Sequence, residues 1–146
     1  MTAANPNTIQ VSRAFSVPAE RIFDAWIEPT VAGKWLFATP TGQMVRVEID
    51  PRVGGKFTIA ERRDGVDVEH QGEYQEIDRP RRLAFTFVVP KYSTVSTKVT
   101  IDLVTKGTGC ELTLTHEGVL PEWLESGRNG WKMLLDNLAG VVVGVN

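Results

Sequence analysis

Hydrophobic positions near the start of the chain predict one strand followed by two short helices. The apolar positions between residues 9 and 15 favour a strand. A helical stripe with the spacing i, i+3, i+4 and i+7 follows, made of Ala19, Ile22, Phe23 and Trp26. Pro18 suits the first turn of this helix, and the Glu28-Pro29 step ends it, because a residue before proline avoids the helical region. A second short helix is expected over residues 30–35.

Six segments with a period of two come next, and this period is typical of half-buried strands. They cover residues 45–49, 56–62, 69–76, 83–89, 95–103 and 110–116. Turn-forming residues separate them, as in the hairpin signal Arg-Asp-Gly at residues 63–65. Connections this short join antiparallel neighbours, so the six strands are expected to form an antiparallel meander.

The end of the chain carries a second helical stripe, made of Trp131, Leu134, Leu135, Leu138, Val141 and Val142. Gly127, Gly130 and Gly140 leave the ends of this helix undefined. The strand phases predict that it packs against Phe85, Phe87, Val99, Ile101, Leu112 and Leu114. No other element is long enough to cover the sheet. The pattern therefore predicts an α+β fold, in which an antiparallel sheet of six to seven strands wraps a long C-terminal helix and leaves a pocket between them.

One strand places unusual residues on its inward side. Within residues 69–76 a run of Glu and Gln takes one phase, so His70, Gly72 and Tyr74 share the inward phase. The imidazole and the phenol could anchor a ligand, and a histidine satisfied by backbone is the open alternative for His70. Gly72 would leave room for a ligand or for a helix side chain, with a β-bulge as the alternative. His70 and Tyr74 would lie ~13 Å apart along the strand, so they would hold the two ends of a drug-sized molecule.

The remaining titratable residues favour structural explanations. His116 lies near the rim of the sheet, where a histidine paired to backbone is favoured and a ligand contact is the alternative. Glu61 and Glu76 lie near strand ends, which favours solvated carboxylates over a buried general base. Arg63 is expected in a solvated turn. The two histidines would lie ~14 Å apart in a flat sheet, with no cysteine or carboxylate spaced to join them, so neither a metal site nor another cofactor is predicted.

Composition narrows the classes of partner. The 146 residues fit a single domain, expected over residues 9–146 after a loose polar tail at residues 1–8. The net charge of -2 and a pI near 5.7 argue against nucleic acid or an anionic membrane surface as a partner. Cys110 is the only cysteine, which excludes an internal disulfide. The sequence shows neither a signal peptide nor a membrane span, so a cytoplasmic location is expected.

Five segments of the chain resemble a known family, in the same order. They are VPAERIFDAWIEPTVAGKW (17–35), DPRVGGKFTI (50–59), GEYQEIDRPRRLAFTF (72–87), LTLTHEG (112–118) and GWKMLLDNL (130–138). Through them the chain is similar to the family named for the C-terminal domain of the activator of the ninety-kilodalton heat-shock chaperone ATPase. The resemblance implies a helix-grip fold of the START-like (SRPBCC) superfamily. That superfamily includes lipid carriers, hormone receptors, polyketide cyclases and chaperone cofactors, so the fold leaves the function open.

A hydrophobic or amphipathic small molecule bound between sheet and helix is the function that these patterns favour. Its predicted contacts are His70, Gly72, Tyr74, Phe85, Phe87, His116, Trp35 and Trp131. Most of the large aromatic residues are expected in the core; Trp35, Phe37 and Trp123 lie near the mouth in a helix-grip fold, so gating of the entrance is the alternative for them. Two alternatives stay open: a cochaperone that stimulates a heat-shock chaperone ATPase, and a cavity enzyme that uses acid–base residues. Binding is favoured over catalysis, and a homodimer is left open.

Overall fold

The computed structural model describes residues 7–143 and shows the predicted order of elements. The expected tail at residues 1–8 lies mostly outside the described residues, and Thr8 already belongs to the first strand. The elements are β1 (Thr8–Phe15), α1 (Ala19–Ile27), α2 (Pro29–Ala32), β2 (Gln43–Ile49), β3 (Lys56–Arg63), β4 (Val66–Asp78), β5 (Arg82–Phe87), β6 (Thr97–Lys106), β7 (Gly109–Glu117), the 3-10 turn η1 (Pro121–Trp123) and α3 (Leu124–Val143).

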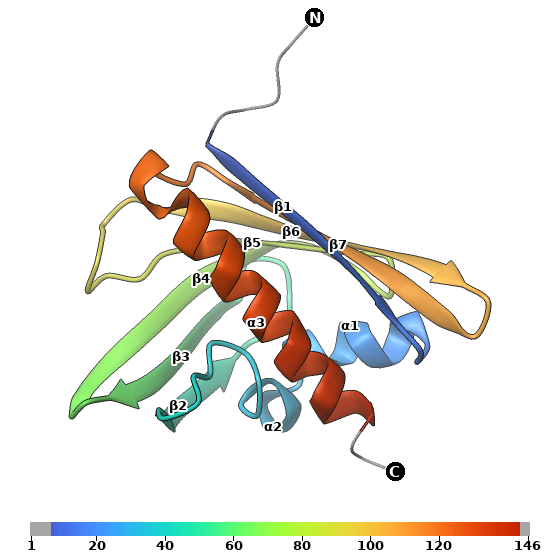
Figure 1. Ribbon diagram of the computed structural model, residues 1–146, viewed down its shortest axis with the longest axis horizontal. Helices are drawn as coiled ribbons and strands as arrows, with labels where there is room; N and C mark the ends of the chain where they lie inside the picture. The colour runs from blue at the N-terminus through green and yellow to red at the C-terminus, as the bar shows by residue number, and fades with distance from the viewer. Residues whose placement is uncertain (1–6, 144–146) are drawn as a thin grey trace, which may run out of the picture.

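The strands form one antiparallel sheet of seven, in the order β1-β7-β6-β5-β4-β3-β2. Strands β2 to β7 follow one another as the predicted meander, and β1 adds an edge strand beside β7. Helix α3 crosses one face of this curved sheet, and α1 and α2 lie together beside its C-terminal end (Figure 1). The fold is therefore the α+β helix-grip architecture, with two short helices after the first strand.

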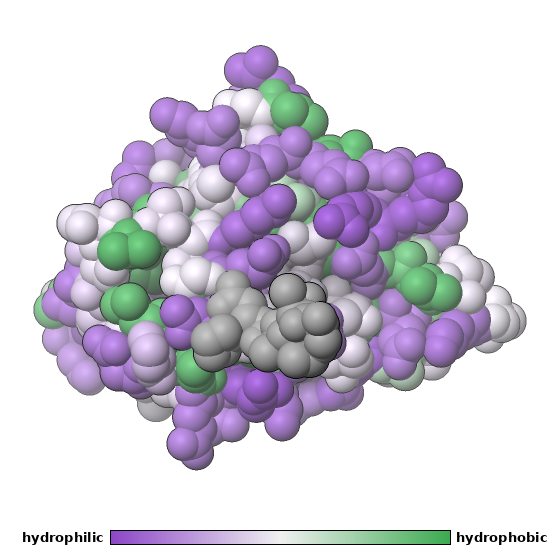
Figure 2. Space-filling model, turned by 90° about the horizontal axis from the view of Figure 1, so that it is seen from above, coloured by the Kyte–Doolittle hydropathy of each residue, from purple (hydrophilic) through white to green (hydrophobic). Residues whose placement is uncertain are grey.

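The core lies between the sheet and α3, as the strand phases predict. Four of the predicted residues have no exposed surface: Val99, Ile101, Leu112 and Leu114. They form one hydrophobic cluster with Phe85 and with Leu134, Leu135 and Leu138 of α3, and the partly buried Phe87 packs against it. The α1 stripe of Ala19, Ile22, Phe23 and Trp26 is buried in the same cluster. Seen from above, the molecule presents mainly polar residues, with hydrophobic ones in small separate groups (Figure 2).

The strand prediction fails at Val89, which lies beyond the end of β5 at Phe87, and at two further positions that each have a local cause. Val45 is exposed because the register of β2 shifts between Met44 and Arg46, which places a bulge at this residue. Val95 lies outside β6 and is exposed, since the strand begins only at Thr97. The backbone N–H of Val95 instead donates to the hydroxyl oxygen of Ser93, a local bond that competes with strand pairing.

The helices differ from the prediction mainly at their ends. Helix α2 covers Pro29–Ala32 and ends at Gly33, so it is shorter than the expected residues 30–35. Helix α3 begins at Leu124 and continues through all three glycines that left its ends undefined. Burial of the Trp131 to Val142 stripe stabilises α3 despite its glycines, because tertiary packing supplies most of a helix's stability.

Replacing Leu135 with alanine tests the packing of α3. The Leu135 side chain is 2% exposed and does not line the pocket described below, so its loss should create a cavity inside the core. We expect the free energy of unfolding to fall by about 2–5 kcal/mol, measured by denaturant titration. A loss below ~1 kcal/mol would contradict this packing, because only a poorly packed site tolerates the change so well.

Candidate functional site

A pocket opens between the N-terminal half of α3 and the sheet. Its volume is about 430 Å³, which falls in the range of small-molecule sites. Its walls come from β3, β4 and β7, from the segments after α2 and between β5 and β6, and from residues 118–120. The aromatic lining residues are Phe37, Phe87, Tyr92, Trp123 and Trp131, and the aliphatic ones include Ile9, Val88, Val89, Val119, Met133 and Leu134. The pocket is therefore a largely apolar space with a few polar side chains.

His116 belongs to a directed chain of hydrogen bonds along one wall of the pocket. The indole N–H of Trp131 donates to His116 Nδ1 over 3.1 Å, and His116 Nε2 lies 2.7 Å from Thr97 Oγ1. The Thr97 hydroxyl in turn donates to the carbonyl oxygen of Phe87 over 2.9 Å. Because an indole only donates, Nδ1 must be unprotonated, and the single imidazole proton lies on Nε2.

This arrangement holds His116 in its neutral form. Burial lowers the pKa of His116 to about 4, from an ordinary value of 6.5. A second proton on Nδ1 would face the indole N–H, so protonation would also break the bond to Trp131. The prediction of a structural histidine paired to backbone is thus wrong in its partners, since His116 pairs with the side chains of Trp131 and Thr97.

His70 forms part of another wall, within a stack of aromatic rings. Its ring lies parallel to that of Phe37, with ring centres 4.3 Å apart, and Phe87 lies on the same stack. Nδ1 lies 3.1 Å from the carbonyl oxygen of Ile59. A carbonyl only accepts, so Nδ1 carries the proton. Burial lowers the pKa of His70 to about 4, so the ring is neutral near pH 7 and its Nε2 is an acceptor.

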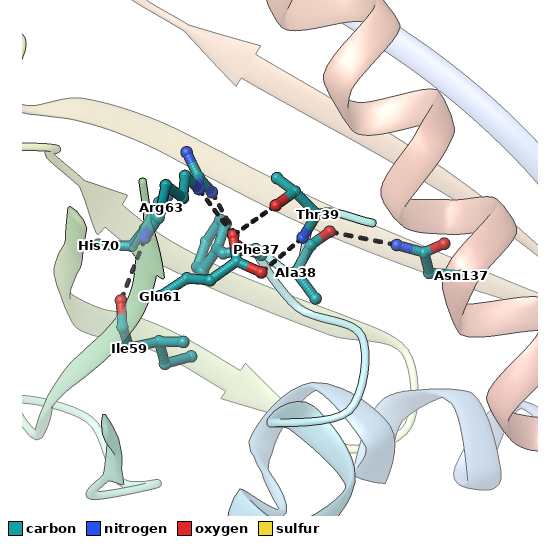
Figure 3. A network of polar contacts seen from close by, with 8 residues as sticks. All are labelled: Phe37, Ala38, Thr39, Ile59, Glu61, Arg63, His70 and Asn137. Carbon is teal, nitrogen blue, oxygen red and sulfur yellow. Dashed lines mark hydrogen bonds and ion pairs between the residues drawn. The ribbon is translucent and has the colours of Figure 1, made fainter. Parts of the chain in front are cut away.

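A partly buried ion pair holds the segment that carries Phe37 (Figure 3). Arg63 Nε donates to Glu61 Oε1 over 2.6 Å, and Arg63 Nη2 donates to the Phe37 carbonyl oxygen over 3.1 Å. Thr39 donates its backbone N–H to Glu61 Oε2 and its hydroxyl to Glu61 Oε1, over 2.7 and 2.9 Å. From α3, Asn137 donates to the Ala38 carbonyl oxygen over 3.3 Å. These bonds fix residues 37–39, where Phe37 has a φ of 61°.

The position of Glu61 corrects a prediction. Its side chain is 1% exposed rather than solvated, and Arg63 lies against it instead of in a solvated turn. Burial by itself would raise the pKa of Glu61, but the hydrogen bonds from Thr39 and Arg63 outweigh it and hold that pKa below its ordinary value. Glu61 is therefore an ionised structural carboxylate. The solvated position expected for Glu76 is confirmed, because that residue is exposed.

Four of the eight predicted contact residues line the pocket, namely His70, Phe87, His116 and Trp131. Tyr74 and Phe85 are buried deeper, where their rings pack against each other and against Phe57. Burial raises the pKa of Tyr74, with a smaller contribution from the charge of Asp50. His70 and Tyr74 thus do not face one ligand together in this pocket.

Two further residues occupy places other than the predicted ones. A Cβ on Gly72 would overlap the Phe57 ring and the Thr86 carbonyl oxygen, so the gap that this glycine leaves is already filled. Trp35 is fully buried, contacts Trp26 edge to face and donates to the Ala25 carbonyl oxygen over 3.0 Å. The expected entrance role therefore fits Phe37 and the half-exposed Trp123, which both line the pocket, and does not fit Trp35.

The sequence analysis missed Arg63 and Thr39 as parts of the site. Arg63 has the same strand phase as Ile59 and Glu61, so period-two alternation already points it inward beside a carboxylate. Thr39 carried no such signal, because it lies in an irregular segment 22 positions away from Glu61. Among the described residues, no cluster of three or more His, Cys, Asp or Glu side chains could hold a metal ion.

Comparison with known proteins agrees with this architecture. The model of the family "Activator of Hsp90 ATPase homolog 1-like protein" matches residues 16–142, which is most of the chain. The chain belongs to this family. No curated protein matches the sequence. None of the described helices is long and apolar enough to span a membrane.

Several solved structures share the fold of this activator-like family. Protein CV1439 from Chromobacterium violaceum is 31% identical with a TM-score of 0.81, over 94% of this chain and 98% of that one. Protein NE0264 from Nitrosomonas europaea is 20% identical with a TM-score of 0.84, over the whole of both chains. An AHSA1-like protein from Aeromonas hydrophila is 19% identical with a TM-score of 0.82, over 94% of this chain and 92% of that one. The last two likenesses support the fold alone.

The two neutral histidines predict loss of stability in mild acid. Between pH 6.5 and 4 the unfolded chain binds protons at these residues, whereas the folded chain does not, so stability falls as the pH is lowered. Each histidine contributes at most about 1.4 kcal/mol per pH unit in this window. His116→Gln removes one of these two groups. The loss of unfolding free energy on going from pH 7.0 to 4.5 should therefore be smaller than in wild type, by at most about 1.4 kcal/mol per pH unit, measured by urea titration at the two pH values.

A matched control keeps the imidazole and removes one of its partners. Thr97→Val breaks the bond to His116 Nε2, so it should lower stability at both pH values and retain the wild-type pH dependence. Identical pH dependence in wild type and His116→Gln would show that His116 is not held neutral in the folded protein.

Proposed function

We propose that the protein binds a small, mostly apolar molecule in the pocket between α3 and the sheet. The observation that carries the proposal is the pocket itself, whose volume of about 430 Å³ suits a drug-sized ligand. Aromatic and aliphatic side chains make up most of its wall, and the few polar groups could orient a bound molecule. Membership of the family is consistent with a small ligand-binding domain.

The titratable groups support binding rather than acid–base catalysis. His116 uses both ring nitrogens in hydrogen bonds, and Glu61 is fully engaged with Thr39 and Arg63. Tyr74 does not line the pocket. Among the predicted acid–base candidates, His70 is therefore the one that lines the pocket and has a ring nitrogen available for a hydrogen bond. Catalysis by an acid and a base needs a second such group.

A cochaperone role is the second candidate, favoured by hydrophobic side chains at the pocket entrance. Trp123 and Tyr92 are about half exposed and lie in ring contact, and the exposed Val95 and Leu120 line the same pocket. Exposed aromatic side chains of this kind are common in protein interfaces. The unfilled pocket, however, is what a ligand-binding domain needs and a purely protein-binding domain does not.

Filling the pocket from α3 tests the proposal. Gly130 lines the pocket, and a Cβ at this position would meet nothing within 4 Å. Gly130→Phe should therefore be accepted at its Cβ and direct a ring toward the cavity, and leaving glycine should raise helix stability by roughly a few tenths of a kcal/mol. We expect the affinity for the fluorescent probe N-phenyl-1-naphthylamine to fall at least tenfold, measured by fluorescence titration.

Gly140→Phe is the matched control, because Gly140 lies in the same helix, has the same open surroundings and does not line this pocket. It should bind the probe as wild type does. Wild-type affinity in Gly130→Phe, with thermal melts that show a folded protein, would place the binding elsewhere and overturn the proposal.

A further inference from the structure

The charges around the pocket are arranged so that they cancel. Of the residues that line it in the described part of the chain, Arg63 alone carries a formal charge at neutral pH. That charge does not stand alone, because Arg63 Nε donates to Glu61 Oε1 over 2.6 Å. The Glu61 carboxylate is almost completely buried behind the pocket wall. A molecule in the pocket therefore faces a neutral pair.

The polar atoms left over suit an uncharged partner. Neutral His70 carries its proton on Nδ1, toward Ile59, so its Nε2 can accept a hydrogen bond. Arg63 uses Nε and Nη2 in bonds to Glu61 and Phe37, while within the described residues no bond reaches its Nη1. With the hydroxyl groups of Tyr92, Ser93 and Ser126, which also line it, the pocket thus offers donors and acceptors without a net charge.

From this geometry we infer that the pocket selects uncharged amphiphiles, with an apolar body and an O–H or N–H group that donates to His70, over anions of the same size. The inference rests on the proposed function and names its class of ligand. An alcohol, a phenol or an aromatic amine has this chemistry.

The physical reason is the cost of moving an anion out of water. An ionised group in an apolar site is stabilised only when an unpaired positive charge compensates for its lost hydration. Here Glu61 already neutralises Arg63, and the same carboxylate would repel an incoming anion. A neutral donor loses much less hydration, and the acceptor at His70 replaces the bond that it made to water.

A pair of related probes tests this selection. N-Phenyl-1-naphthylamine and 8-anilinonaphthalene-1-sulfonate share the same ring system and N–H group, and only the second carries a negative charge. We expect wild type to bind the neutral probe at least tenfold more tightly in fluorescence titrations at pH 7.5. Equal affinity, or tighter binding of the sulfonate, would overturn this inference alone. Failure of both probes to bind would overturn the proposed function and this inference with it.

Two variants separate charge selection from the greater hydrophobicity of the neutral probe. Glu61→Gln leaves the charge of Arg63 uncompensated, so affinity for the sulfonate should rise several-fold. Arg63→Gln leaves the carboxylate uncompensated, so affinity for the sulfonate should fall further. Affinity for the neutral probe should change less in both. If Glu61→Gln does not fold, Arg63→Gln still decides, because an unchanged ratio of affinities in a folded variant would show that the pair does not control selection.

His70→Leu tests the hydrogen bond to the ligand. Loss of the acceptor should weaken binding of N-phenyl-1-naphthylamine by about 2- to 10-fold. Tyr74→Phe is the control, since its hydroxyl group lies outside the residues that line the pocket and its removal should leave affinity unchanged. Equal losses in the two variants would contradict a specific role for His70.

Discussion

The packing of α3 across the sheet is the interaction on which both the core and the pocket depend. Toward its C-terminal end the helix presents leucines that are almost fully buried. Toward its N-terminal end it presents small residues. At Gly127 it approaches β1 so closely that a Cβ would lie 2.7 Å from Ile9, whereas Gly130 faces open space. Because one rigid helix spans both regions, the side chains that it presents decide where the interface is filled and where a cavity remains.

The polar side chains around this cavity are satisfied mainly by one another. Glu61 accepts hydrogen bonds from Thr39 and Arg63, and His116 is held between Trp131 and Thr97. Buried polar groups are costly when unpaired, so these hydrogen bonds favour one arrangement of the walls over others. The polarity of the pocket toward a ligand is limited to the atoms that these networks leave over.

Solved structures with this fold show how one framework can be built from different sequences. NE0264 shares the fold at a TM-score of 0.84 with only 20% identity. The helix, the sheet and their apolar contact faces need only hydrophobic residues at a suitable spacing, which many sequences satisfy. The chemistry of the pocket depends instead on a few residues at its wall, in this chain Phe37, Arg63 and His70. Function therefore has to be argued from those residues rather than from the fold.

The order of elements, the inward phases of β5 to β7 and the stripe of α3 could be predicted from the sequence, because periods of 2 and 3.6 residues depend only on neighbours along the chain. The burial of Glu61 could not, since a segment 22 positions away folds over it. Likewise, only packing decided that Phe57 fills the gap at Gly72 and that Trp35 lies in the core. The sequence by itself determined which faces are apolar; the tertiary structure decided which apolar surfaces meet and which enclose a cavity, because side chains from distant segments compete for the same space.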